Sequence, residues 1–597
     1  MKKKVQALVK GFLTTYALTT AFHVPFSLYQ FETVFDYIIA SVYELLGEYQ
    51  LEFVLIWILA SVFYYQIECK FEQKKDASRI LAGFFAVCLL FGRSYHELAS
   101  WEYCLGSPVN FLKFILAFLG YGCLFHTIIS VAFHFLKENS FVGEEIHFFS
   151  KNAFLKSFLI LAGVYGLAVL ISYPGTLCWD TVGQIEQVIT DSGYSAHHPL
   201  THTLLVGGLV RLGDVLFGAY EPGLFLYMIL QVVMLAAALA STVAVLAKRK
   251  VLFRWLAGLL VLYCITPVYT NIVSIAIKDV PYCAFVIGYG VCFALLLEEP
   301  TYIKNKKFLL CFVLMQLGAI LFRNNGLPMV LLSGLAALVY LFGKYTWRER
   351  LQYCLAAFAV SVAVGKLISI LLMQVTGAVE GSSGEMLSIP FQQTARYLQV
   401  YGQEITSEER TAIEEVLGPV EDIAGAYDPA ISDPVKALYD KTSTGKDLVN
   451  YLNVWVKGLV KHSLVYIEAF LVHIYGWFTP GVSNAIRYEI EYDLISQQGL
   501  FPEAQKILLF IYRFADRISI ISVLQNIGAF VWGLFFIVYY QYKEKKYSLI
   551  YATLPLWVSL LVCMASPCFI YHPRYALPII FLLPFLYVMT VSGKGES

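Results

Sequence analysis

Five charged residues near the ends of hydrophobic segments are candidates for a common chemistry: Asp180, Lys278, Asp279, Arg323 and Arg574. A charged side chain at membrane depth costs roughly 2.5–3.5 kcal/mol on insertion scales, so such groups usually face a polar cavity or a partner. Three cations and two acids at one interface predict a site for an anionic ligand that is itself carried by the membrane.

Each of these residues also has a plainer interpretation. Asp is a preferred N-cap, so Asp180 could cap the helix that follows it. Lys278 and Asp279 could form a local ion pair, worth under about 1 kcal/mol if exposed. Arg323 and Arg574 could anchor lipid head groups. If these side chains form a site, they must converge. If they anchor lipid head groups, we expect them to be dispersed around the rim of the molecule.

Asp180 lies in a polar loop, residues 174–200, that also carries two adjacent histidines, His197 and His198. Two adjacent His residues cannot easily bind one metal ion from a regular helix, and ordinary interfacial histidines are the alternative. If a divalent metal ion takes part, we expect Asp180, Asp279 and His198 to hold it.

The composition is that of an integral membrane protein. The chain has 597 residues, of which 58% are hydrophobic and only 14% are charged, whereas a soluble domain has about 25% charged residues. Its formal net charge is zero. This argues against a nucleic-acid partner, because no basic surplus is present to neutralise phosphates. The twelve cysteines include no CxxC pair, so we expect neither a disulfide framework nor a Cys-type zinc site.

About fourteen apolar segments approach the length of about 20 residues that a membrane span needs. They lie near 11–30, 51–67, 79–98, 110–136, 157–173, 224–247, 251–272, 282–298, 308–322, 327–343, 351–375, 520–540, 548–566 and 575–592. The apolar segment 201–218 is interrupted by Arg211 and Asp214, and we expect it to lie flat in the interface. The predicted fold is therefore an all-α polytopic membrane protein.

Lys and Arg collect in alternate loops, which places those loops and both termini in the cytoplasm. If 201–218 were a span, the Lys248-Arg249-Lys250 cluster would lie outside. The opposite face then holds the loop 174–200 and the large segment 376–519, which we expect to be mainly helical. The predicted divisions are 1–150 (extra amino-terminal spans), 151–375 (membrane core), 376–519 (outer helical region) and 520–597 (carboxy-terminal spans).

Several motifs together resemble the GT-C superfamily of membrane glycosyltransferases, with the closest likeness to a bacterial branch. The motifs are Tyr-Pro-Gly-x-x-x-x-Asp-x-x-x-Gln at 173–184, His-His-Pro at 197–199, Lys-Asp-x-Pro at 278–281, Arg-Asn-Asn-Gly at 323–326, Ser-Ile-Pro-Phe-Gln-Gln-Thr-Ala-Arg at 388–396 and Arg-Tyr-x-Leu-Pro at 574–578. The resemblance covers roughly 157–592. One departure is that the protein mannosyltransferases carry adjacent acids in the first loop, where Trp179-Asp180-Thr181 offers one.

The resemblance implies a GT-C-like helical bundle that uses a polyprenyl-phosphate sugar. Asp180 would be the general base that removes a proton from the acceptor. The residues expected to bind the donor phosphate are Lys278, Arg323, Arg396 and Arg574. The residues expected to bind substrate, or to act as a second acid, are Asp279, His197, His198, Gln184 and Tyr571. The expected partners are an envelope glycan, lipid or protein acceptor and membrane lipid, and a divalent metal ion is the one cofactor considered.

Two other functions would use the same residues differently. A transporter or flippase of a lipid-linked sugar, or of another anionic lipid, would use the cations as a head-group cradle. Such proteins often have internal repeats, and we find none in the sequence. A membrane scaffold that binds an envelope partner through 376–519 would not need Lys278, Arg323 and Arg574 at span ends.

Overall fold

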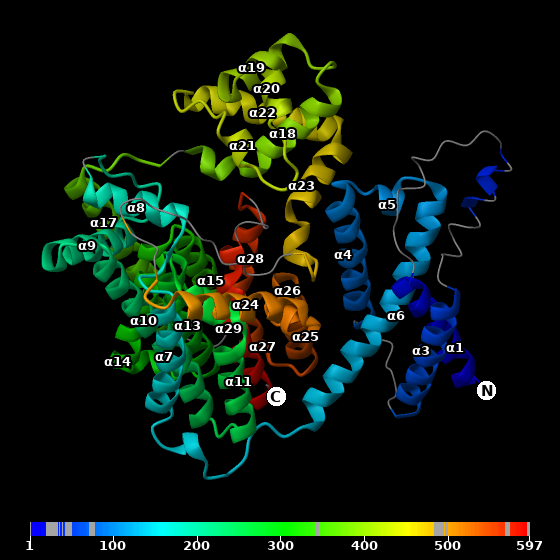
Figure 1. The fold of residues 1–597 in the computed structure, drawn as a ribbon, viewed down its shortest axis with the longest axis horizontal. Coiled ribbons are helices and arrows are strands. Elements are labelled where there is room, and N and C mark those ends of the chain that lie inside the picture. The colour runs from blue at the N-terminus through cyan, green and yellow to red at the C-terminus, as the bar shows by residue number, and fades with distance from the viewer. Residues whose placement is uncertain are drawn as a thin grey trace. The chain divides into compact units, whose positions relative to one another are not determined.

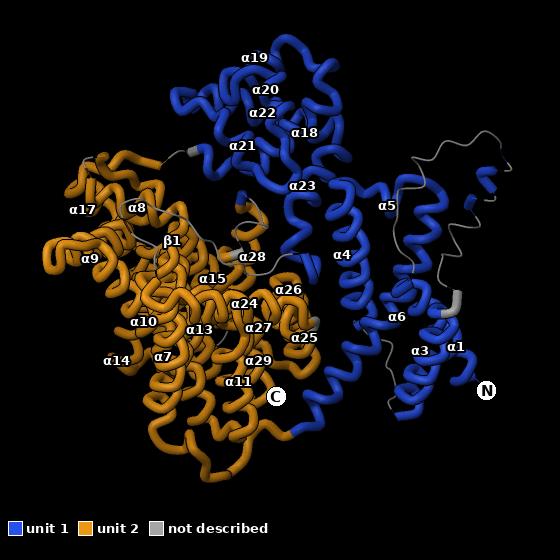
Figure 2. Tube along the Cα trace, viewed as in Figure 1, with its two compact units in different colours: residues 1–139, 384–482, 567–571 blue, residues 140–383, 483–566, 572–597 orange. Residues whose placement is uncertain are grey.

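The computed structural model describes most of the chain, and the described part forms two compact units (Figure 1, Figure 2). Unit 1 comprises residues 1–139, 384–482 and 567–571, and unit 2 comprises 140–383, 483–566 and 572–597. The described residues are 2–19, 34, 36–38, 40, 41, 50–70, 78–190, 192–341, 346–381, 383–482, 495, 499–567 and 573–593. Tyr571 and the second half of the first predicted span lie outside them.

The chain is a helical membrane protein, as its composition predicts. Among the described residues, nine helices are long and apolar enough to cross a membrane, or ten if one bent pair counts as a single span. The nine are Glu52–Lys70, Ser78–Leu98, Pro108–Glu138, Ala153–Ile171, Leu200–Phe217, Glu221–Lys248, Asp279–Glu298, Tyr547–Met564 and Arg574–Ser592. The bent pair is α11 (Phe253–Ile265) and α12 (Pro267–Val273), which meet at an angle of 51°.

The other predicted spans form shorter or divided helices, so the number fourteen stays a prediction. α15 (Gly326–Leu341) and α17 (Val360–Thr376) are apolar but only 16 and 17 residues long. The segment 201–218 forms α9 (Leu200–Phe217), which its length and composition place among the nine. Figure 1 draws α9 across the direction of α7 (Ala153–Ile171), and its predicted place in the interface stays a prediction.

Unit 1 contains two groups of helices. The first is α1 (Lys2–Thr19), α3 (Gln50–Lys70), α4 (Ser78–Leu98), α5 (Glu102–Leu105) and α6 (Pro108–Glu138). The second is α18 (Ser388–Tyr401), α19 (Ser407–Leu417), α20 (Val420–Gly425), α21 (Asp433–Lys436), α22 (Gly445–Lys461) and α23 (Ser463–Phe478). Over 388–478 the segment 376–519 is thus mainly helical, as predicted.

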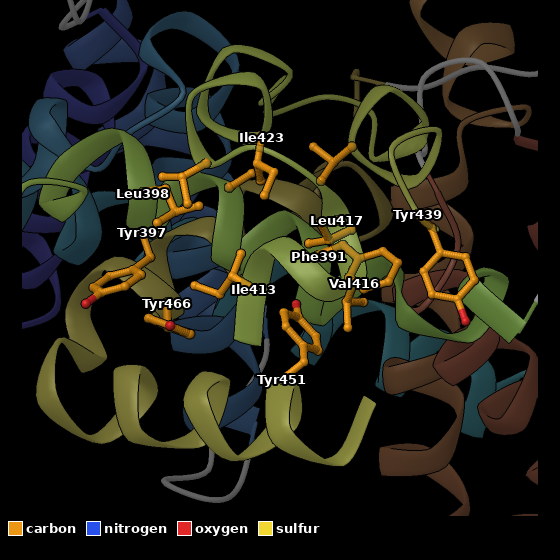
Figure 3. Packing of buried hydrophobic residues seen from close by; sticks show 13 residues of the cluster. Phe391, Tyr397, Leu398, Ile413, Val416, Leu417, Ile423, Tyr439, Tyr451 and Tyr466 are labelled. Carbon is orange, nitrogen blue, oxygen red and sulfur yellow. The ribbon is translucent and has the colours of Figure 1, made fainter. Parts of the chain in front are cut away.

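The second group has its own apolar core (Figure 3). Phe391, Tyr451 and Tyr466 are among its buried members. The neighbouring polar residues of the 388–396 motif serve this packing: Gln393 donates to the Tyr466 carbonyl at 2.9 Å, and the Thr394 and Tyr451 hydroxyls lie 2.8 Å apart. Buried polar groups are costly unless hydrogen-bonded, so this part of the motif stabilises the fold.

Unit 2 is built around α13 (Asp279–Glu298), which is buried along most of its length. A helix that is apolar on all sides is expected to be surrounded by others. Its neighbours include α10 (Glu221–Lys248), α14 (Lys306–Phe322), α27 (Tyr547–Ala552) and α29 (Leu577–Ser592). The remaining helices include α7, α16 (Trp347–Cys354), α24 (Pro502–Arg517), α25 (Ser519–Val523), α26 (Ile527–Lys543) and α28 (Leu554–Met564).

Two short parallel strands set the geometry of the site. β1 (Thr176–Leu177) pairs with β2 (Ile275–Ala276). Gln231 of α10 holds this pair by donating to the Ile275 carbonyl at 2.8 Å. β1 leads into α8 (Trp179–Ile189) and β2 leads into α13, so two helices begin side by side. Residues about 100 positions apart in sequence are thereby brought together.

Candidate active site

Asp180 lies in the first turn of α8 and binds two cations. Its Oδ2 accepts hydrogen bonds from Lys278 Nζ at 2.6 Å and from Arg574 Nη2 at 2.8 Å. The N-cap of α8 is Cys178, so the alternative that Asp180 serves only as a helix cap is wrong. The partial positive charge at a helix N-terminus also favours a carboxylate in this turn.

The second acid, Asp279, pairs with Arg323 rather than with its neighbour in the sequence. Asp279 is the first residue of α13 and is fully buried, and its Oδ1 accepts a hydrogen bond from Arg323. Arg574 Nε lies 3.9 Å from Asp279 Oδ2. Arg574 therefore lies between the two acids. The cluster joins residues of the β2–α13 junction, the α14–α15 turn and the short helical turn Pro573–Ala576 before α29 to Asp180 of α8.

Burial argues against these cations being surface anchors for bulk lipid head groups. The Lys278 and Arg574 side chains are 10% exposed and the Arg323 side chain is 6% exposed. The Arg323 guanidinium also lies over the Tyr575 ring, 4.3 Å from its centroid, a favourable cation–π arrangement. Among the described residues, three cations face two carboxylates, which leaves one positive charge without a counter-ion. Such a cluster is suited to an anion.

His198 completes the cluster as a neutral hydrogen-bond acceptor. Its Nδ1 lies 3.0 Å from Lys278 Nζ, and its Nε2 lies 3.9 Å from Asp180 Oδ1. Burial, together with the nearby Lys278 charge, lowers the pKa of His198 to about 3. The imidazole is therefore unprotonated at neutral pH, and Nδ1 accepts a hydrogen bond from the lysine.

The carboxylate of Asp180 is held in its ionised form. Burial acts to raise the pKa of Asp180, but the charges of Lys278 and Arg574 outweigh burial and hold that pKa well below its usual range. Burial likewise lowers the pKa of Lys278, against the opposing effect of Asp180. Asp180 is a weak proton acceptor as long as both cations contact it.

The family described as "Family of unknown function (DUF6020)" matches residues 189–596, more than half of the chain. The chain belongs to this family. No curated protein and no solved structure gives a match. The range matched by the family begins after Asp180 and includes the other four charged residues of the cluster.

Four other residues proposed from the sequence lie apart from this cluster or cannot be placed in it. Gln184 is fully buried and hydrogen-bonds to Thr203 at 2.9 Å and His202 at 3.0 Å, so it holds α8 against α9. His197 is exposed and contacts the His198 ring at a centroid distance of 4.4 Å. Arg396 belongs to unit 1 and pairs with Glu468 at 3.4 Å. Tyr571 lies outside the described residues.

Two residues near the cluster, Cys178 and His202, are absent from the predicted set. Cys178 Sγ accepts a hydrogen bond from Arg574 Nη1 at 3.7 Å. His202 is fully buried, with its Nε2 2.7 Å from the Tyr227 hydroxyl. His202 follows the His-His-Pro motif closely enough to be noticed in the sequence, whereas nothing in the sequence distinguishes Cys178 from the other scattered cysteines.

The residues that we proposed for a metal ion do not fit one. Within the described part of the chain, no group of three or more His, Cys, Asp or Glu side chains is placed to hold a metal ion. The oxygens of Asp180 and Asp279 already face Lys278, Arg323 and Arg574. A divalent cation there would meet these positive charges at short range.

Proposed function

We propose that this chain is an integral membrane glycosyltransferase of GT-C type. It would transfer a sugar from a polyprenyl-phosphate donor to an envelope acceptor on the extracytoplasmic face, with both termini in the cytoplasm. The proposal joins the resemblance of the motifs to the chemistry of the cluster, which combines anion-binding cations with a carboxylate.

The convergence of Asp180, Lys278, Asp279, Arg323 and Arg574 carries the proposal. These residues come from four separate segments, and each is bonded to at least one other member. A structural ion pair would need one acid and one base. A cluster with a surplus cation, next to helices of membrane-spanning length, favours a ligand that is both anionic and lipid-borne.

In this proposal Lys278 and Arg574 bind the donor phosphate. They are the two cations that contact the partly exposed acid, whereas Arg323 is turned toward the buried Asp279. The planar guanidinium of Arg574 suits a phosphate, since it can donate two parallel hydrogen bonds. Preorganised cations stabilise the charge that develops on a departing phosphate.

Asp180 would act as the general base toward the acceptor hydroxyl. Its side chain is 23% exposed, more than that of Lys278, Arg323, Arg574 or Asp279, so an acceptor can reach it. General base catalysis is typically worth 10²–10⁴-fold in rate. A single displacement at the sugar carbon would invert its configuration.

The test is sugar transfer by the purified full chain in nanodiscs, measured as release of polyprenyl phosphate from a panel of synthetic polyprenyl-phosphate sugars. Asp180→Asn is expected to lower turnover at least about 100-fold, because the amide cannot accept the proton. Asp214→Asn, which changes an exposed carboxylate of α9, is the matched control and is expected to keep wild-type turnover.

Two results would contradict the proposal. One is undiminished turnover of the Asp180→Asn protein with any donor that the wild type uses. The other is vectorial movement of a fluorescent lipid-linked sugar across a proteoliposome without bond cleavage, which would favour the flippase.

A further inference from the structure

The hydrogen bonds that Asp180 makes conflict with its proposed role as a general base. Lys278 and Arg574 both donate to the same oxygen, Oδ2, at 2.6 and 2.8 Å. A general base works best when its proton affinity matches the working pH. The two cations instead hold the pKa of Asp180 well below its usual range. The carboxylate must therefore be released from these two cations before it can act as a general base.

Differences in burial indicate which member of the cluster an incoming ligand can reach first. The Asp180 side chain is 23% exposed, whereas those of Lys278 and Arg574 are 10% exposed. The inner pair, Arg323 and Asp279, is 6% and 0% exposed. A ligand that approaches from solvent or lipid therefore meets the Asp180 carboxylate before it meets the two cations. The inner pair can stay in place while the outer carboxylate moves.

A phosphate group has the charge and the geometry to replace this carboxylate. Both are anions with oxygen acceptors for the ammonium of Lys278 and the guanidinium of Arg574. The surplus positive charge of the cluster also favours the binding of an added anion. His198 Nδ1, 3.0 Å from Lys278 Nζ, keeps the lysine oriented when Asp180 leaves it.

We infer that Asp180 and the donor phosphate compete for Lys278 and Arg574, so that donor binding frees the carboxylate to act as base. This inference rests on the proposed glycosyltransferase function. In the transfer step the acceptor oxygen forms a bond to the anomeric carbon, and the bond from that carbon to the phosphate oxygen breaks. The phosphate leaves with the bonding electron pair, and Asp180 takes the acceptor's proton.

The order of events follows from the competition. Without a donor, Asp180 is paired and cannot activate water or an acceptor. With the donor phosphate bound, the carboxylate loses its two cations and its proton affinity rises. The phosphate gains negative charge as it leaves, which strengthens its bonds to Lys278 and Arg574 in the transition state. Donor binding therefore activates the base, because the phosphate replaces Asp180 as the ionic partner of Lys278 and Arg574.

The decisive experiment measures the affinity of the full chain in nanodiscs for a synthetic polyprenyl phosphate. Asp180→Asn is expected to bind about 10- to 100-fold more tightly than wild type, since the negative charge that competes with the phosphate for both cations is removed. Asp214→Asn is expected to match the wild type. Polyprenol without phosphate and inorganic phosphate alone are the comparison probes, which separate the contributions of the chain and the head group.

The outcomes distinguish the inference from the function on which it depends. If wild type and Asp180→Asn both bind polyprenyl phosphate with equal affinity, or the variant binds more weakly, the competition is refuted and the transferase proposal survives. If neither protein binds polyprenyl phosphate more tightly than polyprenol, both proposals fail.

A second measurement needs no substitution, in case Asp180→Asn does not fold. Carboxylates of wild-type protein are labelled with a water-soluble carbodiimide and an amine, and the modification of Asp180 is followed by mass spectrometry. Polyprenyl phosphate is expected to increase labelling of Asp180 several-fold, because the freed carboxyl is more readily protonated and reached. Unchanged or reduced labelling at saturating ligand would refute the exchange.

Discussion

Breaking the buried ion pair between Arg323 and Asp279 should destabilise the protein strongly. The Asp279 side chain is 0% exposed and the Arg323 side chain is 6% exposed. Removing one partner of a buried pair leaves the other charge unpaired, at a cost of about 3–5 kcal/mol. Arg574 compensates only in part, because its Nε lies 3.9 Å from Asp279 Oδ2, which is an ionic contact but beyond hydrogen-bonding distance.

The assay is the thermal stability of the purified chain in detergent, followed by the loss of the monodisperse size-exclusion peak. At about 2 °C per kcal/mol for a large domain, Asp279→Asn and Arg323→Met should each lower the midpoint by about 6–10 °C. The double variant should lose less than the sum of the two, since it removes both charges. Each single variant should also show a reduced yield of folded protein.

An exposed ion pair supplies the matched control. Arg410 lies 3.1 Å from Glu421, with side chains 39% and 72% exposed. Glu421→Gln should change the midpoint by less than about 2 °C, because solvent-exposed pairs contribute little. Equal shifts for Asp279→Asn and Glu421→Gln, or strictly additive losses in the double variant, would refute the reasoning that a buried pair is present.

Two further predictions concern the loop that carries Asp180. The pKa of His198 is lowered to about 3, whereas an unfolded histidine titrates near pH 6.5. The unfolded chain therefore binds a proton that the folded chain does not, and stability falls as the pH drops from about 6.5 toward 3, by about 1.4 kcal/mol per unit. His198→Gln, whose amide oxygen can still accept a hydrogen bond from Lys278, should lose less stability than wild type between pH 7 and pH 5. Thermal midpoints that fall by the same amount in both proteins over this pH range would contradict this. Gly175 has a φ of +126°, and an added Cβ would lie 2.7 Å from Met228 Cγ, so Gly175→Ala should cost about 1–3 kcal/mol. At Gly183 an added Cβ would have no neighbour within 4 Å, so Gly183→Ala should be neutral or slightly stabilising. Equal thermal midpoints for the two glycine variants would refute the explanation that Gly175 is required by its positive φ and its contact with Met228.

The helical membrane fold could be predicted because long apolar segments dominate the chain. The members of the charge cluster could be predicted because they are exceptions to that apolar pattern. Apolar residues dominate the chain, so each charge near a span end is conspicuous. Lys278 and Arg574 are noticeable for that reason, and the structure brings them to the same oxygen of Asp180. An unpaired charge is costly in the membrane, so a charged residue near the end of a span predicts a partner or a polar site.

The pairing within the cluster could not be predicted, because it depends on packing between distant segments. Lys278 and Asp279 are adjacent, yet each bonds to a residue more than 40 positions away. Gln184 belongs to a motif, but its amide is used to hold α8 against α9. The sequence alone does not tell whether a polar residue in a motif contacts a ligand or a neighbouring helix.

The ion pairs of the cluster explain how three buried cations can be stable in the fold. Cations that are to hold a phosphate at the edge of a membrane must be stable before the phosphate arrives, and an unpaired buried cation is not. Asp279 meets this need for Arg323, and Asp180 meets it for Lys278 and Arg574. Only Asp180 is exposed enough to be displaced. In the proposed exchange, the carboxylate that neutralises Lys278 and Arg574 is the one that the phosphate releases, and this couples its role as a counter-ion to its proposed role as a base.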